Sequence, residues 1–562
     1  MSQEELEALW VSRYHEGVPR HITYPELTLD GLFARTVAER GGADAIMFLD
    51  QRISWRRLGA LAQGFADALG RLGLEKGDRV ALLLPNCPQM VAGFFGTLLA
   101  GGVVVPVNPL YVEREIEEIL RDCGARFVLA LDRVEPRLLA VGKNLTGLRV
   151  IYTHITDTLT GLRGMLAPGV ARRQGNWRDV TSGSQWQEVV REGGRLTPGR
   201  DREALAVLQY TGGTTGTPKG AMLTHGNLVA NAVQTALWTL SDLRGKPARV
   251  IGVLPLFHVY GLTVVMTSTV VNGGTMILLP RFDVDDIVEA IRKHHPELFP
   301  GTPTMYVGVT RAGETRKVDM SSVRVCTSGS APLPQEVQDS FEKVTGAWLV
   351  EGYGLTEASP VTHCNPLSDM RKIGTIGVPY PDTYAKVVAD DGTEPGPGEG
   401  EGELWVKGPQ VMAGYWNHPD ETASALTADG WLKTGDIAAI DADGHFRVVD
   451  RKKDLIIAGG FNIYPREVEE VLYSQPAVAE AAVFGVPDRY RGQTAKAAVV
   501  LRPGLSVTEE ELVAFCNQRL ARYKVPTLWE FRQSLPKSTI GKTLRRVLLE
   551  EHLAGVREEA SS

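Results

Sequence analysis

A repeated order of apolar segments constrains this chain more than any other feature. Stretches 79–107 and 249–279 each open with an Arg-Val pair that starts an apolar run ending at a proline. In each, an apolar segment of helical length then ends at a glycine pair and a second apolar run follows. Acidic segments of helical pattern come next, at 112–120 and 284–291. Strands that are apolar throughout are typical of parallel sheets covered on both faces.

Both copies therefore read strand–helix–strand–helix. Any α/β protein produces such units by chance, but the shared order of proline and glycine pair favours duplicated subdomains. Residues 90–107 carry no charge and reach the length of a membrane-span candidate. Because the same pattern recurs in the second copy, we interpret this segment as a buried helix, a glycine break and a buried strand.

The chain has 562 residues, which is too long for one ordinary core and predicts two or more domains. Region 153–199 is polar and glycine-rich, and we interpret it as a connecting excursion between the two copies. After residue 450 the pattern changes. Short helix-like and strand-like segments there predict a compact domain of about a hundred residues.

Charge and cysteine content exclude several classes of protein. The 60 basic and 67 acidic residues are spread along the chain without a basic stripe, so no nucleic-acid partner is expected. The cysteines are odd in number, far apart and never in a CxxC pair, which argues against a disulfide framework or a zinc site and fits the cytoplasm. They are Cys87, Cys123, Cys326, Cys364 and Cys516. The first residues are acidic and lack an apolar run, so no signal peptide is expected.

The strongest local motif is YTGGTTGTPKG at 210–220, which follows an apolar strand at 204–209. Consecutive small residues let backbone N–H groups approach an anion, and Lys219 adds a point charge for phosphate. A flexible surface loop is the alternative. The Walker spacing fails here, and the segment 536–543 that does match it has proline at the first required glycine, so a P-loop ATPase is not expected.

Six more motifs follow in order along nearly the whole chain. They are PLFHVYG (255–261), SGSAPLP (328–334), EGYGLTEASP (351–360), WLKTGD (431–436), VDRKKDLIIAGGFNIYP (449–465) and LPKSTIGKTLRR (535–546). With the glycine-rich loop, this set resembles the adenylate-forming superfamily of acyl-CoA synthetases, peptide-synthetase adenylation domains and luciferases. Segment 429–453 and the GGFNIYPREVEEVL that follows are similar to bacterial long-chain fatty acyl-CoA synthetases.

The resemblance implies an α/β fold with a large N-terminal domain and a small, mobile α+β C-terminal domain. The large domain, 1–449, would hold two duplicated αβα subdomains and a β-subdomain. The hinge would be 450–453, with Lys453 as the pivot, and the mobile domain 454–562.

The resemblance also implies a set of site residues. Catalytic roles fall on Lys542, Glu357, Thr214 and His258. Magnesium would be held by Thr211 and Glu357, and CoA would pass Gly459 and Gly460. ATP and AMP would be bound by Thr211, Gly212, Gly213, Thr214, Thr215, Gly216, Lys219, Ser330, Ala331, Glu351, Gly352, Tyr353, Gly354, Thr356, Asp436, Arg451 and Lys542.

These roles have a physical basis. Magnesium prefers hard oxygen ligands such as Glu357, and an aromatic face such as Tyr353 can stack on adenine. Asp436 would accept hydrogen bonds from the ribose hydroxyls, and Lys542 would reach the α-phosphate and the substrate carboxylate. His258 takes the place of a gating aromatic ring over the acyl tunnel, with a core or capping histidine as the alternative.

The implied reaction has two steps with ATP, a fatty acid and CoA as substrates. The carboxylate attacks the α-phosphorus and expels pyrophosphate, and the CoA thiol then displaces AMP. Two anions meet in the first step, so cationic and metal stabilisation is needed more than a base. No covalent enzyme intermediate is required.

Other readings remain open. They are a ligase that loads a carrier protein, a synthetase for aromatic acids, and a non-catalytic binding protein on the same scaffold. Ile457, where certain luciferases carry lysine, speaks against light emission. A homodimer and a peripheral contact with the inner membrane surface are further expectations. Segment 151–173 combines apolar residues with Arg163, Arg172 and Arg173, which suggests contact with anionic lipid or a plain surface loop.

Overall fold

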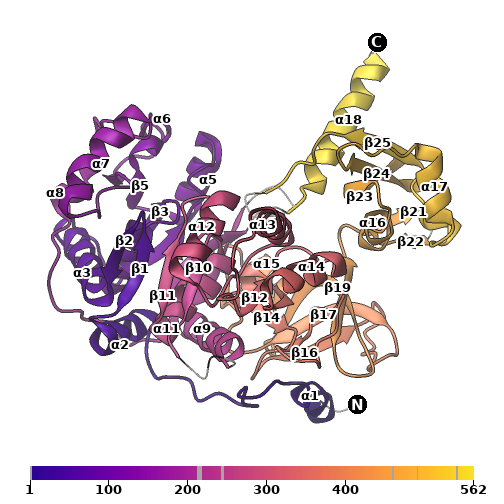
Figure 1. Ribbon diagram of the computed structural model, residues 1–562, viewed down its shortest axis with the longest axis horizontal. Helices are drawn as coiled ribbons and strands as arrows, with labels where there is room; N and C mark the ends of the chain where they lie inside the picture. Colours follow the sequence, from indigo (N-terminus) through magenta and orange to yellow (C-terminus); the bar gives the residue numbers. More distant parts are fainter. Residues whose placement is uncertain are drawn as a thin grey trace. The chain divides into compact units, whose positions relative to one another are not determined.

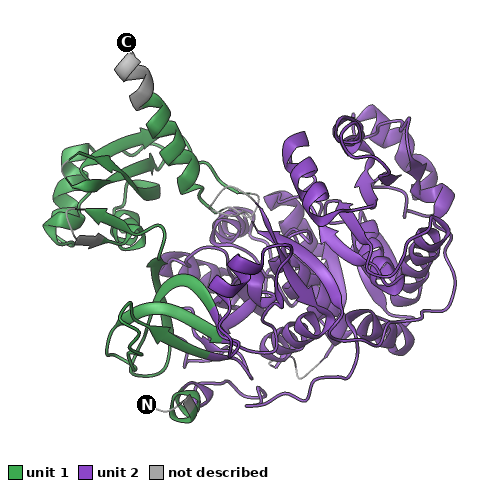
Figure 2. Ribbon diagram, turned by 180° about the vertical axis from the view of Figure 1, so that it is seen from behind, with its two compact units in different colours: residues 1–9, 385–406, 433–562 green, residues 10–384, 407–432 purple. Residues whose placement is uncertain are grey.

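The computed structural model describes residues 3–211, 218–241, 243, 246–458, 461–489, 491–538 and 542–561. The chain divides into two compact units (Figure 2). The large unit holds residues 10–384 and 407–432, and the small unit holds residues 1–9, 385–406 and 433–562. The predicted domain limits at 449 and 453 remain a proposal about which parts move together.

The large unit is built on three sheets. The first has eight strands in the order β18 (Gly414–Tyr415), β9 (Lys219–Thr224), β8 (Leu205–Thr211), β4 (Val103–Pro106), β3 (Arg79–Leu83), β5 (Phe127–Leu131), β6 (Arg149–Thr153) and β7 (Ser184–Gln185). The second has the order β10 (Arg249–Gly252), β11 (Thr275–Leu278), β1 (Asp44–Phe48) and β2 (Gln51–Ser54). The third has the order β12 (Val325–Ser328), β13 (Trp348–Gly354), β14 (Val361–Cys364) and β15 (Val378–Pro379). Leu298 bridges Val250 of β10 and Val325 of β12, which joins the second and third sheets.

Helices form a layer between the first two sheets and cover their outer faces (Figure 1). The shared layer holds α2 (Leu29–Arg40), α3 (Trp55–Arg71), α4 (Pro88–Leu99), α9 (His225–Leu240) and α11 (Ser268–Asn272). In its centre the rings of Phe33 and Phe95 stack at 4.2 Å. The outer helices include α5 (Glu113–Cys123), α6 (Glu135–Val141), α12 (Val284–His294), α13 (Pro303–Arg316) and α14 (Gln335–Thr345). The strands are therefore buried on both faces, as their continuous apolar runs predict.

The two copies found in the sequence form matching strand–helix–strand units, as predicted. Arg79 pairs with Val103 across parallel β3 and β4, and Arg249 pairs with Thr275 across parallel β10 and β11. Gly101 and Gly273 end the intervening helices with φ of +76° and +65°, a conformation that favours glycine. The second copy differs in one respect, because its intervening helix is α10 (Val259–Gly261), a π-helix at Leu262–Thr267 and then α11.

The segment predicted as a connecting excursion contains more structure than expected. It holds α7 (Gly161–Arg173), β7 and α8 (Trp186–Val189), and β7 pairs in parallel with β6 as the edge of the first sheet. The edge strand has only two residues, too few to leave a periodic pattern. Ile151, the first residue of the segment 151–173 for which a lipid contact is suggested, is instead buried in β6.

The small unit holds two sheets. One has the order β16 (Tyr384–Val388), β17 (Glu401–Lys407), β19 (Leu432–Ile440) and β20 (Phe446–Arg451). The other has the order β22 (Phe461–Ile463), β21 (Ile456–Ala458), β24 (Gly492–Leu501) and β23 (Val478–Asp488), with β25 (Leu528–Arg532) on β24. Helices α16 (Pro465–Tyr473), α17 (Glu509–Asn517) and α18 (Arg545–Ser561) accompany the second sheet. The second sheet and its helices form the small α+β domain that the sequence predicts, whereas the first sheet lies almost entirely within the limits predicted for the large domain.

Among the residues that the structure describes, no helix combines the length and the apolar character needed to cross a membrane. The uncharged segment 90–107 forms α4 and β4, both buried, as predicted.

Candidate functional site

The glycine-rich motif begins and ends in a β-hairpin. Thr211 at the end of β8 pairs with Lys219 at the start of β9, and its Oγ1 donates to the Lys219 carbonyl at 3.4 Å. Tyr210 is anchored by a hydrogen bond from its hydroxyl to the Asp122 carboxylate on α5. Between these ends, the predicted residues Gly212, Gly213, Thr214, Thr215 and Gly216 lie outside the described residues.

Lys219 points to a carboxylate and an aromatic ring. Its Nζ lies 3.3 Å from Oε1 of Glu421 on α15 (Pro419–Ala425), and 5.8 Å from the centroid of the Tyr415 ring. Tyr415 belongs to β18, which pairs with β9 through Ala221. A cation near an aromatic face is attracted to it, so Tyr415 helps to fix the lysine that the sequence assigned to phosphate.

Tyr415 also contacts the predicted metal ligand. Its hydroxyl donates to Oε1 of Glu357 at 2.7 Å, and Met412 N donates to the Glu357 carbonyl at 2.8 Å. Burial raises the pKa of Tyr415, and the neighbouring Glu357 carboxylate raises that pKa further. The phenol therefore stays protonated and donates to the carboxylate over the ordinary pH range.

Ser330 and Ala331, two of the residues predicted to bind ATP, lie just beyond the carboxyl end of β12. Strands β12 and β13 run in parallel and pair Ser328 with Glu351, so the segment after Ser328 lies beside Glu351. Leu333 N donates to Oε2 of Glu351 at 3.2 Å, which ties this segment to β13. Ser330 has φ of +69° and, like Ala331, is half-buried.

Beyond Glu351, strand β13 carries Gly352, Tyr353 and Gly354. A Cβ at Gly354 would lie 2.2 Å from the Pro360 carbonyl oxygen, so no larger residue fits there without a backbone shift. Tyr353 packs edge-on against His363 with ring centroids 6.0 Å apart, which sets the direction of its ring. Thr356 starts the short helix Thr356–Ala358, whose second residue is Glu357.

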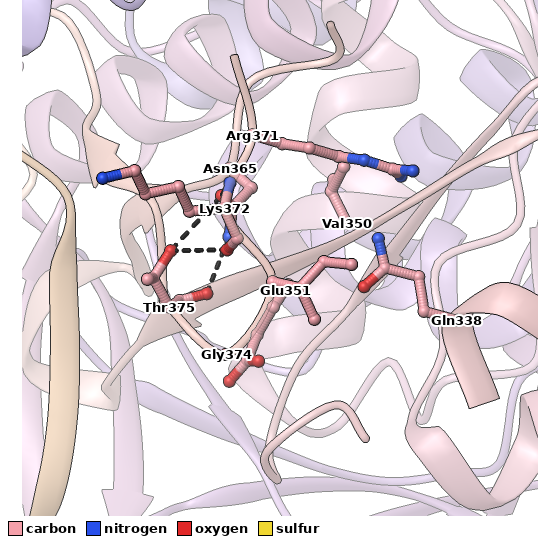
Figure 3. Close-up of a pocket in the computed structure, with 9 residues that line it drawn as sticks. Gln338, Val350, Glu351, Asn365, Arg371, Lys372, Gly374 and Thr375 are labelled. Carbon is pink, nitrogen blue, oxygen red and sulfur yellow. Dashed lines mark hydrogen bonds between the residues drawn. The ribbon is translucent and has the colours of Figure 1, made fainter. Parts of the chain in front are cut away.

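A pocket beside β13 is lined by Glu351 and several other polar side chains (Figure 3). Asn365 donates to the Thr375 carbonyl at 2.7 Å and accepts from Lys372 N at 2.9 Å. Arg371 forms an ion pair with Glu342. These bonds fix the segment 371–375 beside the strand that carries the adenine residues, and sequence reasoning did not single them out.

His258 caps a helix. Its Nδ1 accepts a hydrogen bond from Tyr260 N at 3.2 Å at the start of α10. This is the capping alternative named above, and the gate role stays a prediction.

In the small unit, Asp436 and Arg451 face each other across β19 and β20. Arg451 Nε lies 3.1 Å from Oδ1 of Asp436, and Asp436 is only 4% exposed. Thr434 Oγ1 donates to the Leu404 carbonyl at 2.7 Å and accepts from Asp436 N at 3.1 Å. The structure thus pairs the two residues that the sequence assigned to ribose and phosphate.

Lys542 interacts electrostatically with Asp436 and Arg451. Burial lowers its pKa to about 8, and the positive charges of Arg451 and Arg545 add to this effect against the opposing charge of Asp436. An amine with such a pKa exists in both protonation states near neutral pH. Three predicted site residues of the small unit therefore influence one another.

The predicted hinge is tied to the elements that follow it. Asp450 accepts hydrogen bonds from Arg451 N and from Arg466 N, each at 2.7 Å, and Arg466 lies in the first turn of α16. Lys452 pairs with Asp390 at 2.9 Å, whereas Lys453 is exposed. Gly459 and Gly460, predicted to line the CoA path, lie outside the described residues.

Sequence reasoning missed Tyr415 and Glu421 as site residues. Both lie about two hundred residues after the loop whose lysine they contact, so only the fold brings them there. The available signal was weak, because Tyr415 lies in the stretch KGPQVMAGYW (407–416), outside the motifs named above.

The residues present fit magnesium as an ATP-bound ion. Glu357 offers a hard carboxylate whose Oε1 is already oriented by Tyr415, and Thr211 offers a hydroxyl. In the described ranges no three His, Cys, Asp or Glu side chains form a metal-holding group. Magnesium usually relies on one or two protein carboxylates plus substrate phosphates, which agrees with a single glutamate.

Comparison with known families decides the classification. Residues 33–416 match the family model described as AMP-binding enzyme, and residues 467–542 match the AMP-binding enzyme C-terminal domain. The chain belongs to the AMP-binding enzyme family. This confirms the resemblance to adenylate-forming enzymes and the large-and-small division of the fold.

Individual members of the AMP-binding enzyme family extend the comparison. The chain is 45% identical to a long-chain-fatty-acid–CoA ligase of Bacillus subtilis over 96% of this chain and 98% of the relative. It is 37% identical to a feruloyl-CoA synthase of an Amycolatopsis species over 90% of this chain and 94% of the relative. An ATP-bound crystal structure of MatB from Rhodopseudomonas palustris matches with a TM-score of 0.80 and 30% identity, covering 94% of this chain and 99% of that chain.

Proposed function

We propose that this protein is a long-chain fatty acid–CoA ligase. The observation that carries the proposal is the 45% identity over nearly the full length of both chains to an enzyme of that name. The identity to the feruloyl-CoA synthase is lower and covers less of the chain. The overall reaction joins a fatty acid to CoA and splits ATP into AMP and pyrophosphate.

In the first half-reaction a carboxylate oxygen of the fatty acid attacks the α-phosphorus of ATP. The new P–O bond forms as the bond to the β-phosphate oxygen breaks, and pyrophosphate leaves. Lys542 carries the positive charge that draws the carboxylate and the α-phosphate together, and Lys219 faces the outer phosphates. Glu357 and Thr211 would hold magnesium, which would neutralise charge on the phosphate oxygens.

In the second half-reaction the CoA sulfur attacks the acyl carbonyl carbon of the adenylate. The C–O bond to AMP breaks, AMP carries away the electron pair and the thiol proton goes to solvent. Asp436 holds the ribose of the leaving group, and its bond to Arg451 fixes the direction of its carboxylate. We expect the small domain to rotate about Lys453 between the two steps. This rotation would withdraw Lys542 from the site and bring the CoA path to it.

Two partner assignments belong to the same proposal. Fatty acids partition into lipid, so we expect the enzyme to work at the inner membrane surface as a peripheral protein. A homodimer stays a prediction.

ATP–pyrophosphate exchange with palmitate, benzoate or coumarate, followed by AMP release with and without CoA, tests the proposal. Exchange with palmitate and AMP release that depends on CoA is the expected result. Exchange only with benzoate or coumarate would make this an aromatic acid ligase. Exchange with palmitate but transfer only to a carrier protein would indicate carrier loading, and no exchange with any acid would indicate a binding protein.

A further inference from the structure

Helix α7 (Gly161–Arg173) turns its large apolar side chains to solvent. Leu162, Met165, Leu166 and Val170 are 71%, 81%, 59% and 50% exposed. Their spacing of three and four residues places them on one stripe of the helix. Single exposed apolar residues are ordinary, but four on one stripe form a continuous patch, which monomeric proteins seldom leave uncovered.

The inward side of α7 is made of small residues. Ala171 is the buried residue of this helix. A Cβ at Gly164 would lie 2.5 Å from the Leu159 carbonyl oxygen, so only glycine fits there. A surface helix normally buries its large apolar residues and exposes its small or polar ones. Helix α7 has the opposite arrangement.

Hydrogen bonds fix the start of α7 in this orientation. The side-chain Oε1 of Gln51 accepts from Thr160 N at 3.1 Å, and Arg57 donates to the Thr158 carbonyl at 2.9 Å. Arg163 donates to the Leu49 carbonyl at 3.0 Å, which places the half-exposed side chain of Leu49 next to the helix.

The segment after α7 is held by a buried carboxylate. Glu135 is fully buried and accepts from Thr181 N at 2.7 Å, Ser182 N at 3.0 Å and Arg178 Nε at 2.8 Å. His154 stacks on Trp177 with ring centroids 3.5 Å apart. Both ends of helix α7 (Figure 1) are therefore held by contacts with the rest of the large unit, and its apolar stripe is exposed in this orientation.

The charged residues of α7 indicate what covers its apolar stripe. The helix carries Arg163, Arg172 and Arg173, all exposed, and no acidic residue. Arg172 pairs with Asp179 at 2.8 Å and Arg163 lies 3.7 Å from Asp50, both at the surface, where such pairs are weak. An exposed apolar stripe flanked by arginines fits the boundary between the headgroups and the acyl chains of an anionic bilayer.

We propose that the exposed stripe of α7, together with Leu49, docks on an anionic lipid bilayer. The apolar side chains enter the headgroup boundary and the three arginines lie at the level of the lipid phosphates. The inference rests on the peripheral membrane contact in the proposed function and assigns that contact to one helix. Lipid binding is measured without substrates, so its failure is distinct from a failure of the ligase assay.

Vesicle sedimentation of the full chain tests the proposal, with phosphatidylcholine vesicles that either contain or lack phosphatidylglycerol. The expected result is binding to the anionic vesicles, reduced at least ten-fold in a Leu162→Ser/Met165→Ser variant, since two large apolar groups lose their burial. Leu110→Ser/Val112→Ser is the matched control, because both side chains are exposed elsewhere on the large unit. The control should bind like the wild type.

A triple Arg→Gln variant at 163, 172 and 173 should lose the preference for phosphatidylglycerol. Equal thermal midpoints and equal exchange rates with a short, soluble acid would show that every variant is folded. Failure of the wild type to bind anionic vesicles would overturn the proposal, as would unchanged binding of the Leu162→Ser/Met165→Ser variant. A wild-type dimer that this variant converts to monomer, with no change in lipid binding, would assign the stripe to a second copy of the chain instead.

Discussion

The hydroxyl of Tyr415 donates a 2.7 Å hydrogen bond to Oε1 of Glu357, while its ring lies 5.8 Å from Nζ of Lys219. One side chain thus contacts both the carboxylate proposed for magnesium and the lysine proposed for phosphate. The hydrogen bond orients the carboxylate and the ring face attracts the ammonium group. Tyr415 is in this way a positioning residue for both.

Tyr415→Phe should keep the ring and remove only the hydroxyl. A hydrogen bond to a charged group contributes about 1.5–3 kcal/mol, so adenylation at low magnesium should fall about 10- to 100-fold. High magnesium should restore part of the rate, because the loss lies in the orientation of the carboxylate. Tyr473→Phe, which removes a hydroxyl bonded to the Ala481 carbonyl in the small unit, is the control. Equal losses at low and high magnesium would contradict this role.

Glu357→Gln should lower acyl-adenylate formation by several orders of magnitude while the fold stays intact. The amide keeps the size of the side chain but loses the charge that suits a hard cation. Pyrophosphate exchange measured over a magnesium titration checks this, with the thermal midpoint as a control for folding. Unchanged acyl-adenylate formation at saturating magnesium would exclude Glu357 as a ligand.

Two substitutions in the small unit should separate the half-reactions. Lys542→Ala should abolish acyl-adenylate formation from ATP but still convert supplied acyl-adenylate to acyl-CoA. Lys453→Pro fixes φ and removes a backbone donor, so it should form acyl-adenylate but stall before the thioester. Single-turnover assays of each step provide the measurement. If both variants lost both steps equally, alternation about Lys453 would not describe this enzyme.

Adenylation should decline as the pH rises through about 8. Burial lowers the pKa of Lys542 to about 8, and the ammonium form is the one that attracts the α-phosphate. The charge is therefore present below that pH and is lost above it. The profile of kcat/KM for exchange reports the free enzyme and should show this decline. Lys542→Arg keeps its charge to high pH, and the same decline in that variant would assign it to another group.

The duplicated strand–helix–strand units were predictable because their signal is local. Apolar runs, prolines and the glycine pairs at 101–102 and 273–274 each act within a few residues of their own position. The order of the motifs likewise placed Thr211, Lys219 and Glu357 in the large domain and Lys542 in the small one. It also placed Asp436 in the large domain, whereas the structure groups Asp436 with Lys542 in the small unit.

The contacts of Lys219 and the orientation of α7 were not predictable in the same way. Tyr415 and Glu421 reach Lys219 only through the pairing of β18 with β9, which depends on the assembled sheet. Helix α7 carries Pro168 and a set of small residues, and its apolar stripe faces outward. A rule that places the apolar side of a helix inside would therefore predict the wrong orientation for α7.

Lys219, which we propose to bind phosphate, already forms an ion pair with Glu421. If Lys219 has this role, an arriving phosphate replaces the Glu421 carboxylate, and we expect the nucleotide affinity to reflect the difference between these two partners. Glu421 keeps a neighbour after the exchange, since Nδ1 of His418 lies 3.4 Å from its Oε1. Glu421, which is not among the residues proposed to bind the nucleotide, would then act as its competitor. We expect a substitution of Glu421 to change nucleotide affinity while the binding loop stays intact.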